Sequence, residues 1–442
     1  GIAGTISASN SLVGSKSQDL AAATNQPVYP YVQNDCNFVI PFIFLDNGTT
    51  VDAGGLVWMS GSQPTVGVIS SANALMGTTN GDFTKNKIRA LANGNYVLLL
   101  ESWNNGSNGY GSVTLGNGST GTFGIISSAN SLVPEPNDIG TINFTSFYGS
   151  SNFVISRSNA TVNGVTNAGA VTFGNGTFVN GTSTLTGVVS SANSLVGSKQ
   201  DDKVGNNIFP LVNGNYVVVS DKWNQATGAI TLGNGTTGVA GVVSEQNSLI
   251  GGTIGDFNQS TINTNYANTL MVQLRSYDDT SRNLVDSGAA IIFDGTNPAM
   301  GKINATNGYF GGVSSKSGSS TVSITYDYYN KSFYSYFASE KVAGFDLNGA
   351  INPTAIQPNV NTAPTFTSPN SAIFKAGNNE AFQFAAKGLP EAITYSLQSG
   401  SLPSGLTLTE QGLLSGTPAV GTGNTYTFTV PVSYTHLTLP TK

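Results

Sequence analysis

The residues of this chain that could do chemistry are few, and most of them are carboxylates. The 442-residue sequence has 23 acidic and 17 basic side chains, but only one histidine, His436, and one cysteine, Cys36. Because His436 lies in a tail that we exclude below, no imidazole remains for a Ser-His-Asp triad, a His-ligated metal or a general base. A lone cysteine excludes a disulfide framework and a Cys-ligated zinc site. We expect Cys36 to be a small buried residue in a strand.

Five aspartates in two segments could gather oxygen ligands for calcium. Asp46 and Asp52 lie in the first segment, and Asp278, Asp279 and Asp286 lie in the second. Ca²⁺ takes about six to eight oxygen ligands, so either group would need further donors. Solvated polar loops are therefore the expected state, with calcium as the alternative. No catalytic residue is predicted, because the acidic residues fall in no recurring catalytic phrase, although paired carboxylates for glycoside hydrolysis stay open.

Two tryptophans are the candidate ligand-binding residues. Trp103 and Trp223 each follow a predicted strand rich in β-branched residues. An exposed indole face there would offer a platform on which a sugar could stack. The alternative, which we favour, is that both rings pack between neighbouring sheets.

The elements that must position these residues recur about every 56 to 60 residues. The recurring phrase is a glycine, a small residue and a β-type run, usually followed by a turn signal. It reads GLVWMSG, GSVTLGNG, GAVTFGNG, GAITLGNG and GAAIIFDG, beginning at Gly55, Gly111, Gly169, Gly228 and Gly288, with a weaker copy at Gly349. A second phrase, such as GVVSSANSL at 187–195, advances with it. Self-similarity at a fixed period predicts a repeat architecture.

One repeat, residues 201–252, shows what each unit contains. Apolar or β-branched runs at 209–212, 215–220 and 228–232 are separated by turn signals, and a fourth strand begins at Gly241 and closes at 247–251. Four short strands without helical periodicity predict an antiparallel four-stranded sheet whose faces are covered by its neighbours. Radial stacking of such sheets gives a β-propeller, which fits this period better than a parallel β-helix or tandem Ig-like sandwiches.

These motifs resemble the FG-GAP repeat of integrin-α-type β-propellers and of bacterial surface proteins. Residues 211–219 (LVNGNYVVV) are similar to the family's D-x-N-G-D-G-Y-x-D-L-V-V stretch, and residues 75–83 and 249–257 are similar to its L-x-G-x-x-x-G-D-x-F-G stretch. The resemblance implies a calcium loop in each repeat. The matching positions here are the neutral amides Asn93, Asn95, Asn213 and Asn215, which make a poor calcium cage.

The C-terminal part resembles a different family. Residues 363–369 (APTFTSP), 402–408 (LPSGLTL) and 412–418 (GLLSGTP) strongly resemble the Ig-like (He-PIG) domain of bacterial extracellular proteins. We therefore expect an all-β chain with propeller repeats at 1–355, truncated at the N-terminus, a linker at 356–362 and a C-terminally truncated Ig-like β-sandwich at 363–431. Residues 432–442 resemble a sequencing-adapter read-through, and we expect them to be artefactual.

Composition narrows the function. Charged residues make up 9% of the chain, and its pI is about 4.8. We expect no nucleic-acid partner and, without a long apolar run, no membrane span. Repeat scaffolds usually present surfaces, so we expect a non-enzymatic, secreted or surface-exposed bacterial protein, an adhesin-like or structural binding module. Its expected partners are glycans or host, matrix or cell-surface proteins, and no cofactor is expected apart from the calcium alternative. A carbohydrate-active enzyme, an accessory carbohydrate-targeting module and a pure spacer are the alternatives.

Overall fold

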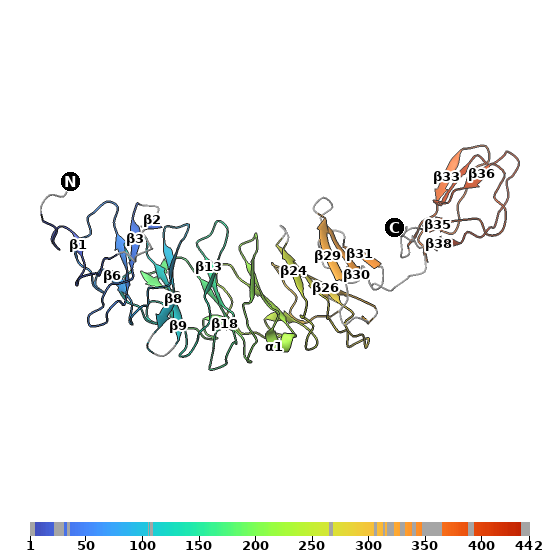
Figure 1. Ribbon diagram of the computed structural model, residues 1–442. Coiled ribbons are helices and arrows are strands. Elements are labelled where there is room, and N and C mark those ends of the chain that lie inside the picture. The colour runs from blue at the N-terminus through green and yellow to red at the C-terminus, as the bar shows by residue number, and fades with distance from the viewer. Residues whose placement is uncertain are drawn as a thin grey trace, which may run out of the picture. The chain divides into compact units, whose positions relative to one another are not determined.

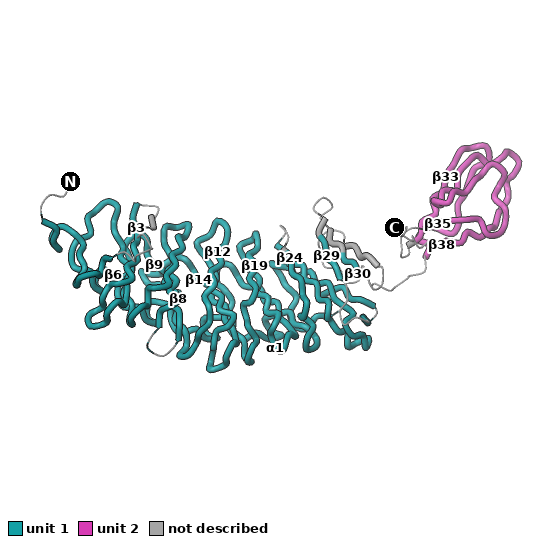
Figure 2. Tube along the Cα trace, in the orientation of Figure 1, with its two compact units in different colours: residues 1–358 teal, residues 359–442 magenta. Residues whose placement is uncertain are grey.

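The computed structural model describes two compact units, residues 1–358 and 359–442 (Figure 2). The described residues are 5–21, 31–32, 36–104, 106, 109–264, 268–304, 307–312, 314–315, 322–327, 332–337, 342–346, 365–387 and 393–434. The boundary between the units falls in the expected linker at 356–362. That linker, the weak repeat copy at Gly349 and His436 lie outside the described residues.

The first unit contains five antiparallel blades of four strands each, which follow one another in chain order (Figure 1). Blade 1 is β2 (Tyr31–Val32), β3 (Phe38–Phe42), β4 (Gly55–Met59) and β6 (Ala74–Met76). Blade 2 is β7 (Asn86–Ala90), β8 (Tyr96–Asn104), β9 (Tyr110–Gly116) and β11 (Leu132–Val133). Blade 3 is β12 (Asn143–Ser146), β13 (Phe153–Arg157), β14 (Ala170–Gly174) and β18 (Ser194–Val196).

The remaining blades repeat this order. Blade 4 is β19 (Asn207–Pro210), β20 (Tyr216–Ser220), β21 (Ala229–Gly233) and β23 (Ser248–Ile250). Blade 5 is β24 (Thr261–Thr264), β25 (Thr269–Leu274), β26 (Ala289–Asp294) and β28 (Gly308–Phe310). A three-stranded sheet follows, made of β29 (Val322–Asp327), β30 (Ser332–Phe337) and β31 (Val342–Asp346). The predicted all-β class, with one four-stranded antiparallel sheet per repeat, is confirmed, whereas the radial closure of a β-propeller stays a prediction.

Two short elements lie outside this scheme. A hairpin of β15 (Phe178–Val179) and β16 (Thr182–Ser183) extends from blade 3. The four-residue α1 (Trp223–Ala226) in blade 4 has left-handed backbone angles at Asn224 and Gln225, so it is a tight turn rather than a regular helix.

The predicted fourth strand is in fact two strands that belong to different sheets. Gly241–Val242 (β22) pairs in parallel with β18 of blade 3, and only Ser248–Ile250 (β23) completes blade 4. The equivalent short strand before each other fourth strand, which we call the linking strand, also pairs with the sheet before it. These pairs are β5 (Gly67–Val68) with β1 (Leu12–Val13), β10 (Gly124–Ile125) with β6, β17 (Gly187–Val188) with β11 and β27 (Gly301–Lys302) with β23. Each blade is thereby covalently continuous with a strand of its neighbour's sheet.

An asparagine holds the turn between each linking strand and the fourth strand. In blade 1, Asn73 donates from Nδ2 to the carbonyl of Val68 (3.1 Å) and accepts from the amide of Ser70 (2.9 Å). A side chain that satisfies two backbone groups stabilises a turn that makes no ladder bonds of its own. The same two bonds recur in the other repeats, where Nδ2 donates to the carbonyl of the residue five before and Oδ1 accepts the amide of the residue three before. The asparagines concerned are Asn10, Asn130, Asn193, Asn247 and Asn307.

The core lies between blades, as the sequence predicted. Blades 1 and 2 share one buried cluster, blades 2 and 3 a second, blades 3 and 4 a third, and blades 4 and 5 a fourth. A further cluster joins blade 5 to β29 and β30 through Ile292, Ile324 and Phe337. Apart from a cluster on blade 1 that includes Leu45, Val57 and Met76, the buried clusters of the repeats are shared between neighbouring sheets, so the stability of a blade depends on the blades beside it.

The recurring aromatic of the second strand packs on a glycine of the third strand. In blade 4, Tyr216 pairs across the sheet with Gly233, and a Cβ at Gly233 would lie 2.0 Å from the Tyr216 ring. An aromatic ring that covers a glycine fills the gap that the missing side chain leaves in a sheet. The pairs Tyr96–Gly116 in blade 2 and Phe153–Gly174 in blade 3 have the same geometry. The glycine that ends the recurring phrase therefore has a packing role.

The second unit contains seven short strands in three small sheets. They are β32 (Thr365–Phe366) with β34 (Ala386–Lys387), β33 (Glu380–Gln383) with β37 (Leu413–Gly416) and β36 (Leu406–Leu408), and β35 (Ile393–Tyr395) with β38 (Val432–Tyr434). Tyr395 and Leu414 are buried, and Tyr395 lies beside Phe366 and Phe384. The pairing of β38 places residues 432–434 in this unit, whereas we had excluded them with the tail.

Candidate functional site

The two candidate ligand-binding tryptophans occupy a packing position. Trp103 is only 2% exposed and belongs to the core between blades 1 and 2, so it presents no ring face to a ligand. Trp223 is half-buried against the core between blades 3 and 4. Trp103 lies three residues after Leu100, which pairs with the third strand, and Trp223 lies three residues after Ser220, which pairs with it in the same way. The equivalent position is held in blades 1, 3 and 5 by Leu45, Ala160 and Tyr277. Side chains of such different kinds at one buried position indicate packing, and Trp223 alone keeps part of its ring accessible.

The cysteine prediction was wrong. Cys36 is exposed and precedes β3, with a left-handed backbone (φ 61°). The buried neighbour is Asn37, which is 7% exposed.

Buried aspartates recur at every blade joint, and the structure gives them a shared role. The Oδ2 atoms of four of them accept two backbone N–H groups of their own loop at 2.6–2.9 Å. Their Oδ1 atoms accept a third N–H from the loop between the second and third strands of the next blade, at 2.8–3.3 Å. The four pairs are Asp19 with Asp46, Asp82 with Asn104, Asp202 with Asn224, and Asp256 with Asp278. We call this contact the Asp latch; all four carboxylates are at most 2% exposed.

The third joint uses the same latch with a different partner. Asp138 Oδ1 accepts from the amides of Gly140 (2.8 Å) and Thr161 (3.1 Å), while its Oδ2 accepts from Arg157 (2.8 Å). Both charged side chains are almost wholly buried, and Arg157 also donates to the carbonyl of Tyr110 (2.8 Å). Burial lowers the pKa of Arg157, and the adjacent carboxylate opposes that shift. A buried ion pair with these additional bonds fixes one arrangement of the joint.

Asparagines form a second series of contacts across the joints. Asn95 accepts from the amide of Gly118 in its own blade (3.1 Å) and donates to the carbonyl of Gly176 in the next (2.9 Å). Asn37, Asn152 and Asn215 make the equivalent pair of bonds, to the carbonyls of Gly118, Gly235 and Gly295. We call this series the Asn ladder, and it links blades 1 to 5 without a break.

The Asn ladder explains the amides at the positions that the FG-GAP resemblance assigned to calcium ligands. Asn93 and Asn213 donate to the same carbonyls as Asn95 and Asn215, at 2.8 and 3.1 Å. Each also accepts the amide of the residue two places on, at 3.1 Å. Their oxygens and amide groups are used within the scaffold.

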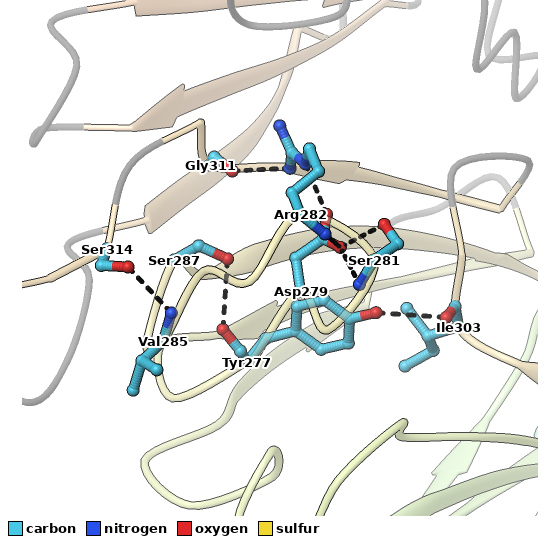
Figure 3. Close-up of polar contacts among 9 residues, drawn as sticks. All are labelled: Tyr277, Asp279, Ser281, Arg282, Val285, Ser287, Ile303, Gly311 and Ser314. Atoms are coloured by element: carbon cyan, nitrogen blue, oxygen red, sulfur yellow. Dashed lines mark hydrogen bonds and ion pairs between the residues drawn. The ribbon is translucent and has the colours of Figure 1, made fainter.

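The calcium candidates divide into three local situations. Asp46 forms an ion pair with Lys16 (2.7 Å) and accepts the amide of Asp52 (2.8 Å). The bond to Lys16 lowers the pKa of Asp46. Asp279 pairs with Arg282 (2.6 Å), whose Nη2 donates to the carbonyl of Gly311 (2.7 Å), as Figure 3 shows. Asp46 and Asp279 therefore each form an ion pair with a basic side chain of the protein.

Asp278 and Asp286 form no ion pair with any described residue, and they lie together at a pocket. The amide of Asp286 donates to Asp278 Oδ1 (2.8 Å), and both residues line a pocket of about 350 Å³ together with Ile254, Val285 and Ser276. Burial, and then the charges of Asp278 and Asp256, raise the pKa of Asp286. Burial raises the pKa of Asp256, which lies directly behind Asp278. The pocket thus has a negative potential that favours a cation or a proton.

Two further observations concern the described residues only. In those ranges, no three or more His, Cys, Asp or Glu side chains are grouped so that they could hold a metal ion. No helix in the same ranges is long and apolar enough to cross a membrane.

The sequence reasoning missed the latch aspartates, although a signal was present. Asp82 and Asp256 stand inside the stretches 75–83 and 249–257, where the aspartate lies five residues after a glycine that closes the fourth strand. Asp19 and Asp202 have the same spacing from Gly14 and Gly197. An aspartate that recurs at the same position in each repeat can indicate a contact between blades as well as a binding site.

The fold and these joints define a tandem-repeat β protein. The chain belongs to the family described as "Repeat of unknown function (DUF5650)", which matches residues 1–23, 32–86, 90–138, 148–206 and 210–260, more than half of its length. Residues 359–439 match the family described as "Putative Ig domain" (He_PIG), which agrees with the predicted resemblance. The FG-GAP resemblance is not shown by these matches and stays a prediction.

Comparisons with individual proteins add little. No curated protein matches the chain. Two structures of prolyl oligopeptidase B from Galerina marginata, one with a hydrolysis and macrocyclization substrate and one of the apo protein, align at 10% and 11% identity with TM-scores of 0.25. The alignments cover 71% and 69% of this chain but only 39% and 37% of those proteins.

Proposed function

We propose that this chain is a non-catalytic binding or structural module of a secreted or cell-surface repeat protein, and that the FG-GAP-like blades present variable loops to a partner. The observation that carries the proposal is the use of the recurring polar residues. The Asp latches and the Asn ladder bond their side chains to backbone groups of neighbouring blades. Recurring polar residues that serve the joints leave recognition to the parts that differ between blades.

The loops between the second and third strands are the parts that differ most. Each begins beside a latch, so all five start from a fixed backbone point. Their compositions differ, and their lengths range from the short connection after β8 in blade 2 to the long loop 275–288 of blade 5. Rigid scaffolds with variable loops at one edge are a common arrangement for binding proteins. Glycans or cell-surface and matrix proteins are the partners we propose.

The proposal is tested with the whole chain displayed on beads. Beads are screened against a glycan array and against cells and matrix proteins, and any ligand is then tested with a variant whose residues 279–285 are replaced by residues 47–51 of the first loop. We expect binding that this loop exchange reduces at least tenfold, while Lys87→Gln on the outer strand of blade 2 leaves it unchanged. Release of new reducing ends from a bound glycan, abolished by Asp278→Asn with Asp286→Asn, would instead show a carbohydrate-active enzyme.

A further inference from the structure

The loop that lines the pocket in blade 5 has a counterpart in blade 1, and the two loops correspond at their ends. The amide of Gly54 bonds the carbonyl of Leu45 (2.9 Å), and the amide of Gly288 bonds that of Tyr277 (3.2 Å). The next residues, Asp46 and Asp278, are both held by a latch aspartate.

The carboxyl groups of the two loops also match. Asp52 donates its amide to Asp46, and Asp286 donates its amide to Asp278, in each case at 2.8 Å. Asp52 and Asp286 share a left-handed backbone, with φ of 51° and 49°. In both blades, therefore, one aspartate accepts the amide of the other, and the second aspartate has a left-handed backbone.

The two loops differ in the side chain that contacts the first aspartate. In blade 1, Lys16 lies three residues before the latch Asp19, and its Nζ lies 2.7 Å from Asp46 Oδ2 and 3.2 Å from the carbonyl of Gly48. In blade 5 the residue three before the latch Asp256 is Thr253, whose hydroxyl lies 3.4 Å from Asp278 Oδ2. Of the two arginines in loop 275–288, Arg282 is paired with Asp279 and Arg275 does not line the pocket, so no basic residue is among the described residues that line it. Among the described residues, none supplies Asp278 with the ammonium that Lys16 supplies to Asp46.

The walls of the pocket suit the rest of an amine side chain. Ile254 and Val285 line it and are 63% and 57% exposed, so they offer aliphatic surface to a ligand. The methylene stem of a lysine buries against such surface while its ammonium reaches a polar group. Val285 is held in place by a bond from its amide to Ser314 (2.9 Å), shown in Figure 3.

We propose that this pocket, lined by Ile254, Gly255, Asn258, Asp278, Val285 and Asp286 among others, binds a primary alkylammonium, namely a lysine side chain of a protein or peptide partner. The ammonium takes the place beside Asp278 that Lys16 takes beside Asp46, and the stem lies on Ile254 and Val285. This inference rests on the proposed binding function and assigns one loop of the module to a basic partner. Exposed ion pairs are weak singly, so one lysine binds with a Kd of about a millimolar or weaker.

The test is a titration of the full chain with Nα-acetyl-lysine methylamide, followed by backbone amide NMR signals. We expect saturable shifts at Gly255 and Val285, and at least tenfold weaker binding of the analogue whose side-chain nitrogen is acetylated. Thr253→Lys should fill the pocket from within and weaken binding at least tenfold. Thr79→Lys is the matched control, because the equivalent residue of blade 2 faces Asn104 instead of an aspartate, and it should leave binding unchanged.

Three outcomes would overturn the inference. The acetylated analogue could bind equally well, Thr253→Lys could bind like the unaltered chain while remaining folded, or CaCl₂ could saturate the same signals while lysine does not. The acetylated analogue needs no substitution, so the test holds even where a variant fails to fold. Retained bead binding to cells or glycans alongside a failed lysine titration would refute this inference alone and leave the proposed function standing.

Discussion

Asn152 of blade 3 donates from Nδ2 to the carbonyl of Gly235 in blade 4 at 2.9 Å, and accepts from the amide of Gly176 in its own blade. One amide side chain thus satisfies a donor and an acceptor that belong to different sheets. The backbone does not make this connection itself, because the two glycines lie two residues after the third strands of separate blades, β14 and β21. The neutral amides that make a poor calcium cage are well suited to this role, since each has both a donor and an acceptor.

The buried hydroxyl pairs inside the blades should be replaceable only as pairs. Thr172 and Ser194 oxygens lie 2.7 Å apart, whereas blade 1 has Val57 opposite Ala74 at the same place. We expect Thr172→Val alone to lower the free energy of unfolding by about 1–3 kcal/mol, because it leaves a buried hydroxyl with one partner fewer. Adding Ser194→Ala should return most of that loss. Urea unfolding of both variants measures it, and a double variant no more stable than the single one would contradict the account.

The ion pair at the third joint should show a large penalty when one member is removed. Arg157 occupies a strand position that is Leu100 in blade 2 and Leu274 in blade 5. Arg157→Leu leaves the buried carboxylate of Asp138 without its cation, so we expect a loss of about 3–5 kcal/mol. Combining it with Asp138→Asn keeps an acceptor for the Gly140 and Thr161 amides without the charge, and should recover part of the loss. A single variant within about 1 kcal/mol of the parent protein in urea unfolding would refute the assigned role.

The acidic pocket should make blade 5 more stable as the pH falls from neutrality. The folded-state pKa values of Asp256 and Asp286 lie above the ordinary 3.8, so the folded chain binds these protons more tightly than the unfolded chain. By linkage, their contribution to stability rises as the pH falls through the raised values toward 3.8. Asp279, with a lowered pKa, acts in the opposite direction only nearer and below 3.8.

Asp286→Asn isolates this effect, because Asn tolerates the left-handed backbone of residue 286. The variant should have a higher Tm than the parent protein at neutral pH, and the difference should shrink as the pH approaches 3.8. Thermal unfolding across this range, with Glu245→Gln as an exposed acidic control, checks the prediction. A Tm difference that grows on acidification would mean that the sign is wrong.

The sequence predicted those parts of the fold that depend on local signals. The period, the all-β class and strands such as Tyr216–Ser220 follow from turn residues and β-branched runs that act over a few residues. The split of the fourth strand was not predicted, because a two-residue strand such as Gly241–Val242 owes its place to pairing with another blade. Local pattern carries no information about that partner.

The candidate site was predicted less well for the same reason. The sequence groups Asp278, Asp279 and Asp286 as calcium candidates, and only the structure separates Asp279 from the other two by turning it toward Arg282. The burial of Trp103 and the exposure of Cys36 also depend on contacts between blades and on backbone angle, neither of which a strand pattern specifies. The latch aspartates can be recognised in the sequence only when the whole repeats are aligned with one another.

The central claim, that recurring polar side chains hold the blades together, is tested most directly by hydrogen exchange of Asn152→Ala. The matched control is Asn175→Ala, since Asn175 bonds only within its own turn, to Thr177. We predict that the Asn152 variant loses about 1–3 kcal/mol of protection in the strands of blades 3 and 4, that blade 1 changes little, and that the control stays close to the parent protein. Equal protection in both variants at the joint of blades 3 and 4 would contradict the claim.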